Sequence, residues 1–242
     1  MRTITLLCGA ALWVIAVIAE AQVDANTSLV FSSKYVSRGV NTVNNWVLQK
    51  NTDVQVGNFT TSLWANMELT NHNGAIYTRS QPAGTFTEWN FTIEYATVWR
   101  DLQLALGWIE YRYPGTGWED TREVYLSLTP DRPNAPNITV YRDLRVAKGT
   151  YITAGVELPA AQSLSISTLL GYGCARFNDA FYGHAKAGFV DLTLGVSTTL
   201  NTASGWQVKP ALWFSTLLDR RLLADQPNRQ NVWFSVELCR AQ

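Results

Sequence analysis

Apolar and polar side chains alternate along most of this chain, and that period of two limits the fold more than any other feature of the sequence. The clearest segment covers residues 88–99. Its apolar positions are Trp89, Phe91, Ile93, Tyr95 and Trp99, and its polar positions are Glu88, Asn90, Thr92 and Glu94. Successive side chains of a β-strand point to opposite faces, so this segment predicts a strand with one apolar face and one polar face.

Comparable segments recur along the chain and are separated by stretches rich in turn residues. We expect strands over residues 27–37, 46–56, 59–69, 87–99, 102–113, 122–129, 138–143, 150–158, 164–175, 188–200, 206–217 and 231–238. The connections between them alternate between short and long, except that residues 129–137, with three prolines, form a longish turn that breaks the trend. Outer-membrane barrels show this alternation because their turns are tight at one end and their loops are extended at the other. We therefore predict an all-β fold, a transmembrane antiparallel up-and-down β-barrel of about 12 strands.

A soluble β-sandwich is the alternative that the strands leave open, but it gives no reason for connection lengths to alternate. After residue 21 the chain has no apolar run of about 20 residues, which a membrane-spanning helix requires. The formal net charge is zero, so nothing indicates a surface for nucleic acid. The ten Trp and ten Tyr residues fit the aromatic girdles of a membrane barrel.

The beginning of the chain has the pattern of a secretory signal peptide. Arg2 supplies the positive start, residues 6–18 form an apolar stretch, and residues 19–21 (Ala-Glu-Ala) form a small-residue cleavage site. We therefore predict a signal peptide over residues 1–21, export to the bacterial outer membrane, and one barrel domain over residues 22–242.

Three short stretches, in this order and spacing, resemble the TorF-type porins. They are Phe31–Val40 (FSSKYVSRGV), Ser62–Asn66 (SLWAN) and Leu106–Gly115 (LGWIEYRYPG), the last followed by Glu123-Val124-Tyr125. The resemblance extends from about residue 29 to residue 173. It implies an outer-membrane location and a porin-like class, and it carries no catalytic residues. The chain departs from the usual barrel ending on an aromatic residue, because Leu238 is followed by Cys-Arg-Ala-Gln.

If the more apolar face of each strand meets lipid, the opposite face turns a mainly acidic set of side chains toward the lumen. The candidate pore-lining residues are Asp53, Glu68, Glu88, Glu94, Glu123, Asp191 and Lys209, and Asp143, Glu157, Glu237 and Lys34 share their face. Twelve strands enclose a lumen of intermediate width. Carboxylates around water raise the local concentration of cations. We therefore expect passive, cation-preferring passage of small solutes.

The alternative is that these acids pair with arginines from inward-folded loops, which would give a non-conducting structural or interaction barrel. Aromatic residues on the same inward face favour partial plugging, and the two interpretations stay open at this point. The aromatic residues are Trp64, Tyr111, Tyr125, Tyr141, Tyr151 and Trp213.

Three arginines, Arg112, Arg122 and Arg142, fall on the outward face at the ends of three successive expected strands. Guanidinium groups pair well with phosphate, so we expect this rim to contact lipopolysaccharide as well as membrane lipid. No catalytic site is predicted. A membrane-embedded phospholipase needs a Ser beside a His on the lipid face, and none lies near His184 in the sequence. Nothing has the spacing of a metal site, and no cofactor is expected.

Overall fold

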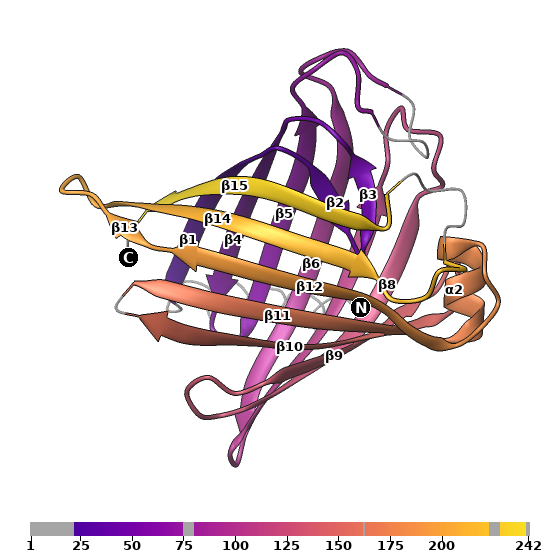
Figure 1. Ribbon diagram of the computed structural model, residues 1–242. Helices are drawn as coiled ribbons and strands as arrows, with labels where there is room; N and C mark the ends of the chain where they lie inside the picture. Colours follow the sequence, from indigo (N-terminus) through magenta and orange to yellow (C-terminus); the bar gives the residue numbers. More distant parts are fainter. Residues whose placement is uncertain (1–21, 75–79, 162, 223–227, 241–242) are drawn as a thin grey trace, which may run out of the picture.

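The computed structural model describes residues 22–74, 80–161, 163–222 and 228–240. Within them, 12 antiparallel strands form one closed barrel (Figure 1). The predicted signal peptide lies outside the described residues. The barrel strands are β1 (Val23–Ser32), β4 (Val47–Val56), β5 (Phe59–Glu68), β6 (Phe86–Trp99), β7 (Leu102–Arg112), β8 (Thr121–Pro130), β9 (Asn137–Asp143), β10 (Thr150–Ala161), β11 (Leu164–Gly173), β12 (Gly188–Thr198), β14 (Trp206–Leu217) and β15 (Gln230–Arg240).

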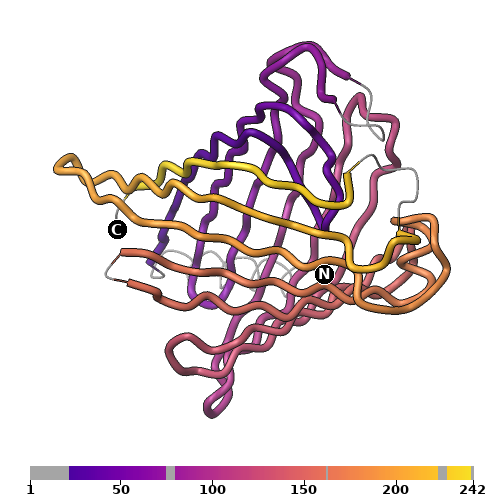
Figure 2. The backbone as a smooth tube through the Cα atoms, viewed as in Figure 1, coloured from indigo at the N-terminus to yellow at the C-terminus, as the bar shows by residue number. Residues whose placement is uncertain are grey.

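The barrel closes where the first strand pairs with the last. Strand β1 is hydrogen-bonded to β4 on one side and to β15 on the other, with Leu29 opposite Leu238. Figure 2 shows the indigo and yellow ends of the chain side by side at this seam. Closure leaves no free sheet edge, which satisfies the backbone hydrogen bonds that a lipid environment cannot. The predicted fold class is therefore confirmed.

The connections separate into two sets, one at each end of the barrel. The turn end carries the short connections 57–58, 100–101, 131–136, 162–163 and 199–205, the last of which contains the short strand β13 (Leu200–Asn201). The loop end carries the connections 33–46, 69–85, 113–120, 144–149, 174–187 and 218–229. The predicted alternation in length is confirmed for most of the barrel, but it fails around β9, where the connections 131–136 and 144–149 are equally long.

The wall has an apolar outside and a polar inside. Phe91 and Ile93 of β6 are each 44% exposed on the outer face. On the inner face of the same strand, the Glu94 carboxylate accepts a hydrogen bond from the Tyr125 hydroxyl of β8. The apolar residues of the segment 88–99 therefore face outward and its polar residues face inward, as predicted. No helix in the described part of the chain is long and apolar enough to cross a membrane.

Two elements at the loop end are not part of the wall. The hairpin of β2 (Tyr35–Ser37) and β3 (Val40–Val43) follows β1, and helix α2 (Ala175–Tyr182) follows β11. The strands expected over 27–37 and 164–175 were therefore too long. The first ends at Ser32, where the Ser32 hydroxyl donates to the Lys34 carbonyl and bends the chain inward. The second ends where Gly173 precedes the helix.

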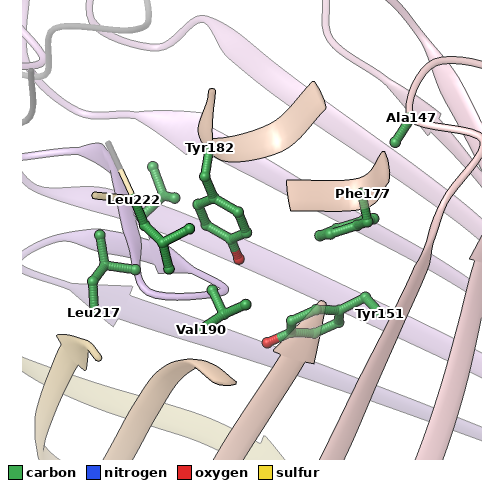
Figure 3. Packing of buried hydrophobic residues seen from close by; sticks show 8 residues of the cluster. Ala147, Tyr151, Phe177, Tyr182, Val190, Leu217 and Leu222 are labelled. Atoms are coloured by element: carbon green, nitrogen blue, oxygen red, sulfur yellow. The ribbon is translucent and has the colours of Figure 1, made fainter. Parts of the chain in front are cut away.

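A compact apolar cluster joins these two elements to the inner wall. Figure 3 shows Phe177 and Tyr182 of α2 extending toward Tyr151, Val190 and Leu217 of the strands. The remaining members of the cluster are Val40, Ala147 and Leu222. Gly149 permits the close approach, because a Cβ there would lie 2.5 Å from the Phe177 backbone nitrogen. The hydrophobic core of this protein therefore lies inside the barrel at the loop end.

Candidate functional site

The barrel lumen is the candidate site, and the hairpin Tyr35–Val43, called the inserted hairpin below, enters it from the loop end. Its turn residues Arg38 and Gly39 have φ values of 49° and 78°. Positive φ at both central residues is the type I′ geometry that matches the twist of two-residue hairpins. All four residues of β3 are buried, so this hairpin is enclosed by protein instead of extending into solvent.

The tip of the inserted hairpin fits closely against the wall. A Cβ on Gly39 would lie 2.7 Å from both Asp191 Cβ and Leu217 Cδ2. Real Cβ contacts are longer than this, so only glycine suits the position both sterically and by its positive φ. The Arg-Gly pair that contributed to the TorF resemblance is thus the tip of the inserted hairpin.

An ion pair joins the same tip to β8 on the other side of the lumen. Arg38 donates from Nη1 and Nη2 to the two Glu123 carboxylate oxygens at 2.8 and 2.7 Å. The two side chains are only 17% and 2% exposed. Burial alone would lower the pKa of the Arg38 guanidinium, but the Glu123 carboxylate outweighs it and raises that pKa well above its ordinary value. The pair is therefore a buried, bidentate, charged contact of the strong class.

Aromatic rings surround this ion pair. The Arg38 guanidinium lies 4.7 Å from the centre of the Tyr151 ring and 5.3 Å from those of Tyr141 and Phe177. The Tyr111 hydroxyl donates to Glu123 at 2.9 Å, so the carboxylate has a second donor. Ring faces attract a guanidinium, and they exclude water from it. The sequence placed these tyrosines inside the barrel but did not identify the cation that they enclose.

A second anchor holds the base of the inserted hairpin. The Tyr35 hydroxyl donates to Glu88 at 3.0 Å, and the Tyr35 ring lies 5.5 Å from that of Trp64. Burial raises the pKa of the Tyr35 phenol well above its ordinary value, and the charge of Glu88 adds to the rise. The phenol therefore stays protonated and keeps donating. Helix α2 contributes a further contact, because the Tyr182 hydroxyl donates to the Arg38 carbonyl at 2.9 Å.

The predicted pore-lining residues divide into two groups along the barrel. Glu68, Glu88, Glu123 and Asp191 are buried near the loop end. Asp191 accepts a hydrogen bond from the Tyr151 hydroxyl at 2.7 Å. Glu88 and Glu123 hold the inserted hairpin through Tyr35 and Arg38, a role that the sequence interpretation did not foresee. That these four carboxylates also line a passage for solutes stays a prediction.

The other three predicted residues lie on the inner face nearer the turn end. Asp53 accepts from the Asn51 amide at 2.7 Å, and Lys209 stands opposite Glu237 in the pairing of β14 with β15. Glu94 is the third. Their part in solute passage stays a prediction.

Solvent reaches the inner face in the half of the lumen near the turn end. Gln55 and Glu157 are exposed although both lie on that face, and the inward Leu169 is 39% exposed. Gly107 leaves room for the Tyr125 ring on this face, because a Cβ there would lie 2.3 Å from the ring. This half is therefore a polar vestibule, in contrast to the packed half at the loop end.

The rim arginines lie on the outer face, two of them beside carboxylates. Arg112 pairs with Glu110 at 3.0 Å and with Asp120 at 2.7 Å, and Arg122 lies 3.5 Å from Glu110. Arg142 donates to the Thr150 hydroxyl at 3.2 Å. The sequence did not predict the two carboxylate partners, which compete with lipid phosphate for Arg112 and Arg122.

One Ser–His contact exists that sequence reasoning missed. His72 Nδ1 lies 3.2 Å from the Ser80 hydroxyl in the exposed loop 69–85. The Ser80 oxygen also accepts from the Asn73 backbone N–H at 3.3 Å. The phospholipase interpretation considered a serine only beside His184, so it did not foresee this contact at His72. The contact lies in a loop and not on the lipid-facing wall, where the phospholipase interpretation required it. Among the described residues, no group of three or more His, Cys, Asp or Glu side chains has the geometry of a metal site.

Comparison with known proteins supports the fold. No family model matches the sequence, so the TorF resemblance stays a prediction, and no curated protein matches it either. The NanC porin structure is similar with a TM-score of 0.57 and 11% identity, over 89% of this chain and 100% of that one. The KdgM porin matches with a TM-score of 0.54 and 11% identity, over 89% and 99% of the two chains. At this identity the likeness shows a shared barrel architecture.

Proposed function

We propose that this chain is a narrow porin-like protein of the bacterial outer membrane that passes small solutes passively. The observation that carries the proposal is the closed barrel with an apolar outer face and a solvent-accessible polar vestibule inside. A barrel exposing this much apolar surface is stable in lipid and not in water. The two similar solved structures are porins, which agrees with the proposal.

The expected location follows from the pattern of residues 1–21 and from the connections. Outer-membrane barrels place their short turns in the periplasm and their longer loops outside the cell. On this basis the inserted hairpin and α2 face the cell exterior, and the vestibule opens toward the periplasm. Solutes entering from outside then meet the packed half first, so the inserted hairpin restricts the size of what passes.

Cation preference is the finer part of the proposal. The inner face near the turn end carries Asp53, Glu94, Glu157 and Glu237 against Lys209. Fixed carboxylates around a narrow aqueous passage raise the cation concentration and repel anions. The net negative vestibule therefore supports weak selectivity for small cations.

A second candidate function is a non-conducting structural or interaction barrel. The buried Arg38–Glu123 pair and the apolar cluster favour it, because together they fill the lumen at the loop end. In this case the external loops, chiefly residues 71–85 and 219–230, would meet a partner and no solute would cross.

Planar-bilayer recording of the purified full chain separates the two candidates. A porin gives stable single-channel steps, and a tenfold KCl gradient gives a reversal potential of the sign for K⁺ over Cl⁻. Absence of steps over repeated insertions, with folded protein verified by heat-dependent mobility in gels, would favour the closed barrel. Steps with anion preference would refute the cation preference while leaving the channel intact.

Lipopolysaccharide binding by the rim is a separate proposal. Arg142 is its best-placed member, because Arg112 and Arg122 already contact Glu110. Replacing all three arginines with Ala should reduce the lipopolysaccharide that copurifies with the protein. An unchanged amount would refute lipopolysaccharide binding by these three arginines.

A further inference from the structure

A pocket opens on the inner wall where the chain leaves β1 and enters the inserted hairpin. Its volume is about 180 Å³. The wall strands β1, β4, β14 and β15 form one side, and the segment 34–36 forms the other. The lining residues are Val30, Ser32, Lys34, Tyr35, Val36, Gln49, Trp213, Trp233 and Ser235.

Two stacked tryptophans line this pocket. The rings of Trp213 and Trp233, which are opposite one another on β14 and β15, lie 6.1 Å apart and only 16° from parallel. The Trp213 indole N–H donates to the Ser235 hydroxyl at 3.0 Å, which fixes that ring. Gly195 of β12 makes room for it, since a Cβ there would lie 2.3 Å from the indole. The aromatic surface is thus built into the wall and turned toward the lumen.

The pocket also contains a cation with no charged partner. Within the described part of the chain, no carboxylate lies within ion-pair distance of the Lys34 ammonium. Partial burial lowers the pKa of Lys34. A half-buried ammonium without a counter-ion is costly, and an anionic group placed beside it relieves that cost.

Few other polar groups in the pocket are available to a ligand. The Gln49 amide donates to Asn66 at 3.2 Å, and its carbonyl oxygen accepts none of the hydrogen bonds found among the described residues. Ser235 accepts from Trp213 and has its own hydroxyl hydrogen left. Tyr35 and Ser32 donate elsewhere, to Glu88 and to the Lys34 carbonyl. The pocket therefore offers one ammonium, one hydroxyl and one carbonyl oxygen beside two stacked indole rings.

We propose that this pocket is a binding site for a small monocyclic aromatic carboxylate carrying a ring hydroxyl. The ligand ring packs against the Trp213–Trp233 stack, its carboxylate meets Lys34, and its hydroxyl donates to the Gln49 carbonyl. Offset stacking on an aromatic face favours a planar ring. A sugar acid is the competing ligand, but its several hydroxyls would lose water without finding partners in so sparse a set of polar groups. The inference deepens the proposed porin function by naming the class of solute that pauses in the lumen.

Isothermal titration of the full chain in detergent tests the site without requiring conduction. The probes are 4-hydroxybenzoate, glucuronate and phenol. We expect 4-hydroxybenzoate to bind and the other two to bind at least about tenfold more weakly, because each lacks the aromatic ring or the charge. Tighter binding of glucuronate, equal binding of phenol, or no binding of 4-hydroxybenzoate would each overturn the proposal.

Matched variants localise the binding. Lys34→Gln should weaken 4-hydroxybenzoate at least about tenfold, whereas Lys50→Gln, which removes a positive charge from the outer face of the same wall, should not. Trp213→Ala should abolish binding, and Trp206→Ala on the outer face of the same strand should leave it unchanged. Should Trp213→Ala fail to fold, Lys34→Gln still decides, because Lys34 lies outside the strands. Unchanged affinity in Lys34→Gln would refute the site.

Failure of this inference is distinct from failure of the proposed function. Single-channel steps without titratable binding would leave a porin that lacks this site. Binding without steps would place the site in a closed barrel and refute the inference that it serves a passing solute.

Discussion

The two halves of the lumen are built from the same strands but differ in what fills them. Near the loop end, Arg38, Tyr182 and the apolar cluster occupy the space between the walls. Near the turn end, Glu157 and Leu169 on the same inner face remain accessible to solvent. The difference shows that alternation along the strands defines the wall, whereas the long connections decide whether the lumen is open.

The largest effect is expected from breaking the ion pair in the packed half. Glu123→Gln leaves the enclosed Arg38 without a charged partner, and removing one member of a buried pair costs about 3 kcal/mol or more. Glu94→Gln in the vestibule disturbs one hydrogen bond from Tyr125 and should cost about 1 kcal/mol. Urea unfolding from lipid vesicles, followed by tryptophan fluorescence, measures both. Equal losses in the free energy of unfolding would mean that the contacts in the two halves stabilise the barrel to the same extent.

A loss at the lower end of that range is expected from opening a cavity in the apolar cluster. Phe177 is 1% exposed between Tyr151 and Tyr182. Phe177→Ala should lower the free energy of unfolding by about 3 kcal/mol, because the surrounding rings close only part of the space. Phe177→Leu keeps most of the volume and should cost about 1 kcal/mol. If the Ala variant is as stable as the Leu variant, the cluster is not tightly packed.

Adding one methyl group to a glycine in each half tests the difference in packing between the two halves of the lumen. Gly39→Ala forces a Cβ against Asp191 and Leu217 at a positive φ, and should cost about 2 kcal/mol. Gly107→Ala meets only the Tyr125 ring, which can swing into the open vestibule, so about 1 kcal/mol is expected. Gly188→Ala is the control, since nothing lies within 4 Å of its added Cβ. The reverse order of the first two would contradict the contrast between halves.

The smallest effect is expected on ion selectivity. Asp53 and Glu157 line the vestibule without an ion pair to any described residue. Neutralising both with Asn and Gln should reduce the preference for K⁺ by about twofold, because other carboxylates remain. Reversal potentials before and after the change measure it. A stronger cation preference in the variant would refute an electrostatic role for these acids.

The wall could be predicted from sequence because each strand carries its own local pattern. Alternation alone indicates that Trp89, Phe91 and Ile93 lie on one face of their strand. The lengths of the connections indicate at which end of the barrel each turn lies. The lumen could not be predicted in the same way. Arg38 and Glu123 meet across 85 positions of sequence, and no local period encodes that contact.

The inserted hairpin was missed for a related reason. Tyr35 continues the apolar positions Leu29 and Phe31 of β1, so period alone extended that strand beyond its end at Ser32. The available signal was Arg38-Gly39, a two-residue turn between short alternating segments. A similar signal for helix α2 was present in the sequence, because Phe177 and Phe181 are four positions apart and therefore lie on one helical face.

The proposed function requires that the inserted hairpin narrows the lumen. Replacing residues 35–43 with a short Gly-Ser connection removes the hairpin and its anchors while leaving all barrel strands in place. Single-channel conductance of this variant and of the unaltered chain should be compared in the same bilayer and salt. The account predicts a several-fold larger conductance in the variant. Equal conductance would show that the inserted hairpin does not limit passage, and it would contradict the proposal that this hairpin narrows the lumen.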